Sequence, residues 1–259
     1  MRFYMPFLVI CLIVGCVDRN DNTNPNRFEK QYETNDAQSG SSSQPLPKLM
    51  TQENKNKSNS PNEKKLHVPL IAQNPELKYG CEVTSLAMIL QYAGIQVDKM
   101  ELANTIEKDH DPIKKNKNGD ITDWGNPNDG FVGDMTGKNA GYAVFDRPIV
   151  QLMEKYLPRR TVNLTGEPFS RLEEQIAKEK PVLVWTTGDY QQPNRWELWN
   201  HGDEQIETPL DLHAVVLVGY DENHVYLNDP LSEKKDVQVN KETFINSWKA
   251  MKMRAVSYN

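Results

Sequence analysis

The polar tract in the first quarter of the chain limits where a folded core can form. Between Asp18 and Lys65 the only large apolar residues are Phe28, Tyr32, Leu46, Leu49 and Met50. Most of the other residues there are Asn, Ser, Gln, Lys, Glu and Pro. Such a segment cannot bury enough apolar surface to offset the entropy of ordering it. We therefore expect residues 17–65 to be a disordered tether and residues 66–259 to form one folded domain.

The chain begins with one Arg and an apolar run from Phe3 to Val17. This run is shorter than the ~20 apolar residues of a transmembrane helix and is typical of a signal-peptide core. Its end, Ile13-Val14-Gly15-Cys16, resembles a bacterial lipobox. The resemblance implies that residues 1–16 carry a lipoprotein signal, with cleavage before Cys16 and lipidation of its thiol. An uncleaved anchor or a plain signal peptide are the alternatives, and each also places the domain outside the cytoplasm.

This location makes the cysteine count informative. The chain has three cysteines: Cys11 would leave with the signal peptide, and Cys16 would carry lipid. Cys81 would then stand alone in an exported domain, where a leftover thiol is a candidate reactive group. The charge balance, 36 acidic against 30 basic residues, lacks the basic excess typical of nucleic-acid binding. We therefore expect no nucleic-acid partner.

The order of hydrophobic patterns predicts an α+β fold, because helices come first and antiparallel strands follow. Apolar residues at helical spacing, ended by Gly94, predict a helix over residues 81–93. Further helices are expected at 97–108, 147–157 and 170–180, and strands at 66–72, 181–187, 213–220 and 224–229. The Gly-, Asn- and Asp-rich stretch 109–141 between them is expected to be a long loop. A solvated strand edge is expected around 234–242, KKDVQVNKE.

Cys81 lies where the first of these helices should begin. A thiol attacks only as its thiolate, and the usual pKa of a free cysteine is about 8.5. A helix N-terminus lowers this pKa, and so does a neighbouring imidazolium. Cys81 is placed for the first effect, and the second requires a histidine from elsewhere in the fold.

The candidate for that histidine is His213, because it lies on a predicted hairpin that spans residues 213–229 and ends in an Asp. If Asp221 to Asn223 form its loop, Tyr220 pairs with His224, and His213 and Asp229 share one face as diagonal neighbours. Asn228 would face the other way because strand side chains alternate, and a bulge would reverse the choice. Asp229 is therefore the expected partner of His213, with Asn228 held in reserve.

Taken together, Gln73, the YGC sequence ending at Cys81, His213 and Asp229 resemble the papain-like cysteine peptidases. The similarity is greatest to the branch of double-glycine leader peptidases and their stand-alone relatives. The sequence WGNPNDGFVGDMTG, which begins at Trp124, adds to it. The resemblance implies a papain-like fold, with the N-terminal helix bearing the Cys packed on a C-terminal antiparallel sheet. It further implies Cys81 as nucleophile, His213 as base and acid, Asp229 as its orienting group, and Gln73 as an oxyanion donor.

The function that follows is hydrolysis of peptide bonds through a thioester, on a lipoprotein at the outer face of a bacterial cytoplasmic membrane. Gly80 and Trp124 are assigned to substrate binding, and neither a cofactor nor a metal is expected. The expected partners are a peptide or protein substrate and, through the lipid, the membrane. The alternatives are a binding module without turnover on the same scaffold and a thiol acyltransferase using the same site. No exporter module is attached, so leader-peptide cleavage is not carried over as the activity.

Overall fold

The computed structural model describes residues 61–259. The predicted signal peptide, lipidated Cys16 and almost all of the predicted tether lie outside these residues and stay predictions. Within the described part, no helix is both long enough and apolar enough to cross a membrane.

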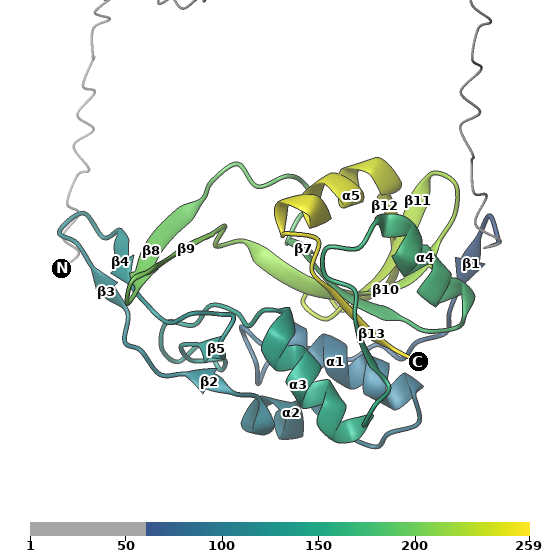
Figure 1. Ribbon diagram of the computed structural model, residues 1–259, viewed down its shortest axis with the longest axis horizontal. Helices are drawn as coiled ribbons and strands as arrows, with labels where there is room; N and C mark the ends of the chain where they lie inside the picture. Colours follow the sequence, from purple (N-terminus) through teal and green to yellow (C-terminus); the bar gives the residue numbers. More distant parts are fainter. Residues whose placement is uncertain (1–60) are drawn as a thin grey trace, which may run out of the picture. The chain divides into compact units, whose positions relative to one another are not determined.

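Helices and strands follow one another along this part of the chain (Figure 1). The helices are α1 Cys81–Tyr92, α2 Lys99–Thr105, α3 Asp146–Tyr156, α4 Phe169–Ala177 and α5 Lys241–Ala250. The strands are β1 Lys64–Lys65, β2 Lys108–Asp109, β3 Lys114–Lys115, β4 Ile121–Asp123, β5 Phe131–Val132, β6 Thr161–Asn163, β7 Val182–Thr187, β8 Glu197–His201, β9 Glu204–Thr208, β10 Leu212–Tyr220, β11 His224–Asp229, β12 Lys234–Asn240 and β13 Ala255–Tyr258.

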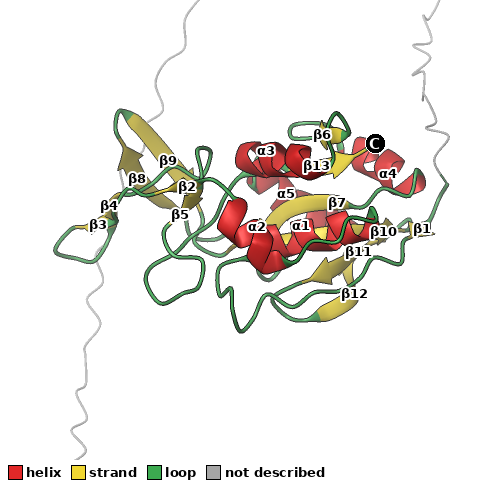
Figure 2. Cartoon of the chain, turned by 90° about the horizontal axis from the view of Figure 1, so that it is seen from below, coloured by secondary structure: helices red, strands yellow, loops and turns green. Residues whose placement is uncertain are grey.

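The main sheet is antiparallel, in the order β12-β11-β10-β7-β13-β6, and β1 also pairs with β10. Helices α1, α2 and α3 lie on one side of its central strands, and α4 and α5 lie on the other (Figures 1 and 2). A smaller sheet, β3-β4-β8-β9, stands apart from the main sheet at one end (Figure 2). The predicted α+β fold, a cysteine-bearing helix packed on an antiparallel sheet, is thus confirmed.

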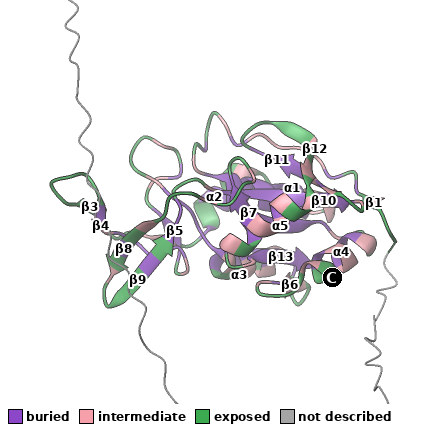
Figure 3. Cartoon of the chain, turned by 90° about the horizontal axis from the view of Figure 1, so that it is seen from above, coloured by how far each residue is buried: buried purple, intermediate pink, exposed green. Residues whose placement is uncertain are grey.

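Helix α1 is the most enclosed helix. Every residue from Cys81 to Leu90 is buried, although the sequence places polar Glu82, Thr84 and Ser85 among the apolar residues. A helix buried all round lies in the interior of its domain, and Figure 3 shows buried colour over α1 and the strands beside it. The buried polar side chains of α1 therefore need partners inside the protein.

The hairpin β10–β11 has two registers. Near His213 and Asp229, Val216 pairs with Asn228, and this pairing agrees with the predicted register. A bulge between Leu217 and Gly219 then shifts the pairing, so that Tyr220 pairs with Val225 and the predicted pairing with His224 is wrong. The turn takes in one more residue than expected, because the Asp221 carboxylate accepts the backbone N–H of His224. At the bulge, the β1 backbone approaches Gly219 so closely that a Cβ there would lie 2.7 Å from a carbonyl oxygen.

Other segments differ from the sequence prediction. Residues 66–72 form no strand: only Lys64–Lys65 pairs with β10, and Pro69, which lacks an N–H, cannot extend the ladder. The stretch 109–141 contains short strands instead of forming one loop. Helix α2 is shorter than predicted at both ends, because Asp98 caps its start and the backbone becomes extended at Ile106. The hairpin β8–β9, helix α5 and strand β13 were not predicted. Strand β12 forms an edge of the main sheet, as expected.

Candidate active site

Cys81 is the first residue of α1 and is 7% exposed. One turn further along the helix, the Ser85 hydroxyl donates to the Ala214 carbonyl at 3.2 Å. This bond fixes the start of α1 against β10 next to His213. Gly80, assigned to substrate binding from the sequence, packs against Leu77, where a Cβ would come within 2.6 Å of the Leu77 Cβ. Its lack of a side chain therefore lets the chain turn into α1.

His213 lies near the start of β10, and its Nε2 is 2.7 Å from Oδ1 of Asp229 at the end of β11. Both side chains are about 4% exposed. An ionised carboxylate accepts hydrogen bonds, so His213 carries its proton on Nε2 in the neutral state. Nδ1 then remains free to accept a proton from another group.

Asp229 accepts hydrogen bonds from several groups at once. Besides His213, it accepts from the Tyr190 hydroxyl at 2.8 Å, the Ser232 hydroxyl at 2.7 Å and the Leu231 N–H at 2.9 Å. Burial alone would raise the pKa of Asp229, but His213, the Ser232 hydroxyl and the Leu231 N–H hold it well below its usual value. Asp229 is therefore ionised at any pH at which the protein would work. Tyr190 was not predicted as a partner of Asp229, because the two residues lie far apart along the chain.

Asn228, the reserve candidate, faces away from His213. Its amide donates to the Val68 carbonyl at 3.1 Å, and its side-chain oxygen accepts the Asp236 N–H. Asn228 thus anchors the segment that enters the domain, and Asp229 is the residue paired with His213.

Gln73 is buried in the loop before α1, and its side-chain amide donates to the Lys78 carbonyl at 2.8 Å. The loop folds back on itself, because the Leu77 N–H bonds to the Gln73 carbonyl. A further bond, from the Gln73 N–H to the Pro230 carbonyl, ties it to the residue after Asp229. The turn therefore takes up the seven residues between Gln73 and Cys81, and Gln73 reaches the same cavity as the thiol.

The thiol of Cys81 has a partner that the sequence did not indicate. Its Sγ lies 3.3 Å from Oε2 of Glu82, the next residue. Burial and the Glu82 carboxylate raise the pKa of Cys81 well above its ordinary value and outweigh the neighbouring Ala214 backbone, which lowers it. The lowering of this pKa that the sequence predicts from the helix N-terminus is therefore not found, because the thiol is buried and an acid lies beside the sulfur.

A cavity of ≈830 Å³ opens over these residues. Cys81, His213 and Gln73 line it, and Trp124 forms part of its wall. Trp124 is 5% exposed and packs on Trp199 and Tyr142, with ring centroids 5.8 and 6.1 Å away. The stretch 109–141, expected from the sequence to line a substrate site, thus contributes to the cavity.

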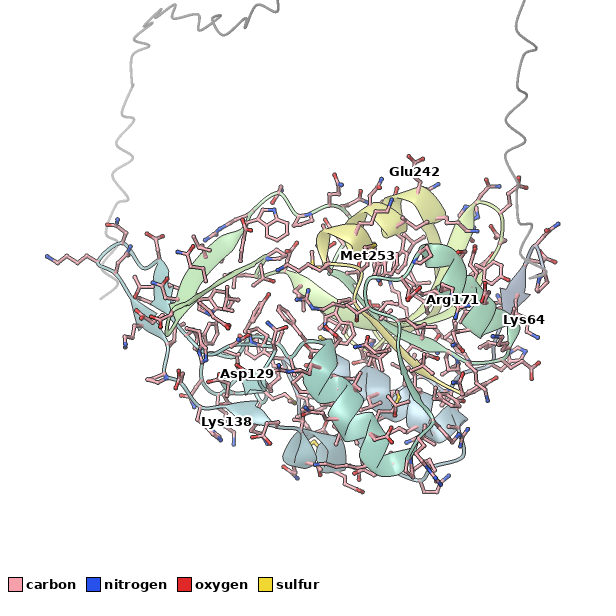
Figure 4. The ribbon with its side chains drawn as sticks, viewed as in Figure 1. Lys64, Asp129, Lys138, Arg171, Glu242 and Met253 are labelled. Atoms are coloured by element: carbon pink, nitrogen blue, oxygen red, sulfur yellow. The ribbon has the colours of Figure 1, made fainter. Side chains whose placement is uncertain are left out.

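A second group of polar side chains lies at the edge of β5, where Figure 4 labels Asp129. Single ligand atoms of Asp109, Asp129 and His201 come within 4.8 Å of one another. Asp129 is also paired with Arg147, and Asp109 accepts the Asn126 N–H at 2.9 Å. These side chains are therefore already bonded within the protein, and the absence of a metal stays a prediction.

A helix with a cysteine at its start, packed on an antiparallel sheet that carries a His–Asp pair, defines the papain-like class of fold. The sequence assigns the chain to one family within this class. A model of the Peptidase_C39 like family matches residues 65–256, so the chain belongs to this family.

Two relatives illustrate the similarity. The uncharacterized protein YvpB of Bacillus subtilis is 39% identical over 182 residues, which cover 70% of each chain. A crystal structure of a Bacillus anthracis protein, assigned as a C39-like peptidase, superimposes with a TM-score of 0.70 at 41% identity. That match covers 77% of this chain and 98% of the other.

Proposed function

We propose that the protein is a thiol hydrolase that cleaves peptide bonds, with Cys81 as nucleophile and His213 as base and acid. The observation that carries the proposal is the 2.7 Å His213–Asp229 pair, whose His213 lines one cavity with a cysteine at a helix start. Membership of a peptidase family supports the class of reaction.

In the proposed reaction, the thiol passes its proton to Nδ1 of His213, and the thiolate attacks the carbonyl carbon of the peptide. Asp229 holds the ring through Nε2 and stabilises the imidazolium that forms. The imidazolium gives its proton to the leaving amine, and a thioester to Cys81 remains. Water, deprotonated by His213, then hydrolyses this thioester and regenerates the thiol.

The oxyanion formed during attack needs hydrogen-bond donors. As the first residue of α1, Cys81 has a backbone N–H with no acceptor within the helix. Gln73 has a second amide hydrogen besides the one given to Lys78. We assign these two groups to the oxyanion, where the loss of one donor costs on the order of a hundredfold or more in rate.

The cavity suits an apolar segment of peptide. Trp124, Ile121 and Tyr142 form an apolar wall, and two leucines at its mouth remain exposed: Leu210 at 47% and Leu231 at 45%. Exposed apolar side chains beside a cleft gain contact area when a ligand covers them. We therefore assign Leu210 and Leu231, together with Trp124, to the binding of apolar substrate side chains.

Replacing Leu231 with Ala should raise the KM for peptide cleavage up to about tenfold and leave kcat nearly unchanged, since contact with a Leu is worth roughly 1–2 kcal/mol. Leu231 is more informative than Trp124, whose truncation would also disturb the packing of Trp199. Met100→Ala is the matched control, because Met100 is an exposed apolar residue on α2 that does not line the cavity. An unchanged KM in Leu231→Ala would remove this residue from the substrate site.

Incubation of the protein with a peptide library, followed by mass spectrometry, tests the function itself. The proposal expects new peptide ends that form with wild-type protein. Failure to cleave any peptide in a diverse library would count against it.

A further inference from the structure

The carboxyl group of Glu82 is fully buried, and both of its oxygens are engaged. Oε1 accepts the Val144 N–H at 3.0 Å, and Oε2 lies 3.3 Å from the Cys81 thiol. Val144 lies two residues after Tyr142, which lines the cavity, and the Val144 carbonyl accepts the indole N–H of Trp185. Glu82 therefore joins the nucleophile to the cavity wall.

None of the described cations is paired with Glu82. Helices α2 and α3 and strands β7 and β10 pack against α1. Cys81 precedes Glu82 on α1, and Tyr142 lies beside the cavity. The elements packed against α1 carry His213 on β10, Lys99 and Glu101 on α2, and Asp146 at the start of α3. Lys99 is bonded to Glu76 and the Ala72 carbonyl, Glu101 to Tyr156, and Asp146 to Arg254. The group in direct contact with Glu82 that can exchange a proton is the Cys81 thiol.

We propose that Glu82 controls the protonation of the nucleophile: protonated, it donates its Oε2 hydrogen to the Cys81 thiolate, and ionised, it holds the sulfur as an unreactive thiol. The proposal deepens the proposed function and rests on it. In the reactive state Cys81 has passed its proton to His213 while Glu82 keeps its own. In the resting state the thiol donates to the carboxylate, and a second negative charge 3.3 Å away opposes thiolate formation.

A pH range follows from the environment of Glu82. Burial raises the pKa of Glu82 to about 7, although the Val144 N–H and Cys81 lower it. A carboxyl with a raised pKa is neutral below that value and loses its proton as the pH rises through it. The reactive form should therefore prevail below about pH 7 and decline above it, by about tenfold one unit higher.

The test is the rate of Cys81 alkylation by iodoacetamide between pH 5.5 and 8, in which the peptide containing Cys81 is followed by mass spectrometry. In the wild-type chain the rate should fall about tenfold between pH 6 and pH 8. Glu82→Gln keeps an oxygen for Val144 and can donate to the thiolate without titrating, so its rate should stay level or rise. Glu242→Gln is the control, since Glu242 projects from α5 into solvent (Figure 4) and should keep the wild-type profile.

A wild-type rate that rises steadily from pH 6 to pH 8 would overturn the role of Glu82, and so would a fall that persists in Glu82→Gln. If Glu82→Gln does not fold, Glu82→Ala replaces it as the variant without a titrating carboxyl. The pH profile of the wild type also tests the proposal without any variant. His213→Ala separates the two proposals. His213-dependent labelling whose profile from pH 6 to pH 8 is the same in wild type and Glu82→Gln rejects only the role of Glu82, and the absence of any His213-dependent labelling rejects the hydrolase.

Discussion

A Cys81→Ala chain should fold normally and lose peptide cleavage by a factor on the order of 10⁴ or more. Residual rates in nucleophile-deleted hydrolases come only from binding and the oxyanion donors, neither of which can form an acyl intermediate. Cys81 is small and borders the cavity, so removal of its sulfur should cost only about 1 kcal/mol of stability. Initial rates of cleavage, with the unfolding transition measured on the same samples, check both parts.

Cys81→Ser is the control for geometry, because it keeps a hydroxyl at the same place but a much weaker nucleophile. It should also be inactive within the same factor. Cleavage at near wild-type rates in either variant would show that another group, or a contaminating peptidase, performs the reaction. Cleavage lost together with the folded state would instead identify Cys81 as a structural residue.

Asp229→Asn should lower kcat on the order of 10³-fold to 10⁴-fold with little change in KM. The neutral amide no longer stabilises the imidazolium, and its NH₂ group can turn toward His213 and select the wrong tautomer. With that NH₂ group in place of Oδ1, the Leu231 N–H loses its acceptor, whereas Tyr190 and Ser232 keep the remaining oxygen. Steady-state kinetics with a cleaved peptide measure the two constants.

Asn228→Ala provides the matching control on the same strand. It removes the bonds to Val68 and Asp236 and should lower the unfolding temperature, yet it leaves the His213–Asp229 pair in place. The folded fraction of this variant should keep its kcat. The reverse pattern, with Asn228→Ala inactive and Asp229→Asn active, would transfer the orienting role to Asn228.

The parts of the fold that could be predicted from the sequence are those with local signals. Helix α1 has a regular apolar spacing and a stop at Gly94, and β7, β10 and β11 are short apolar runs bounded by turn residues. Strand β8 and its partner β9 escaped prediction because they are short and mostly polar, with no regular apolar alternation, a composition that also fits an exposed loop. Their order in the smaller sheet depends on tertiary pairing with β4.

The candidate site could be predicted only where residue types and order identify a role. The sequence predicted Cys81, His213 and Asp229 as one site, because Cys81 lies at a predicted helix start and the other two residues lie on one predicted hairpin. No local pattern in the sequence marks Glu82, and only the burial of α1 on all sides encloses its carboxyl beside the thiol. Tyr190 reaches Asp229 through tertiary contact, which no local pattern reports.

The measurement that tests the central claim most directly compares Cys81 alkylation between pH 5 and pH 6.5 in the wild type and in His213→Ala. An isolated thiol with a pKa near 8.5 is less than about 1% ionised in this range. The thiolate–imidazolium account predicts labelling at least about tenfold faster than such a thiol, lost when His213 is replaced. Labelling that rises only near pH 8.5, and that is the same in both proteins, would contradict the account and favour a binding module without turnover.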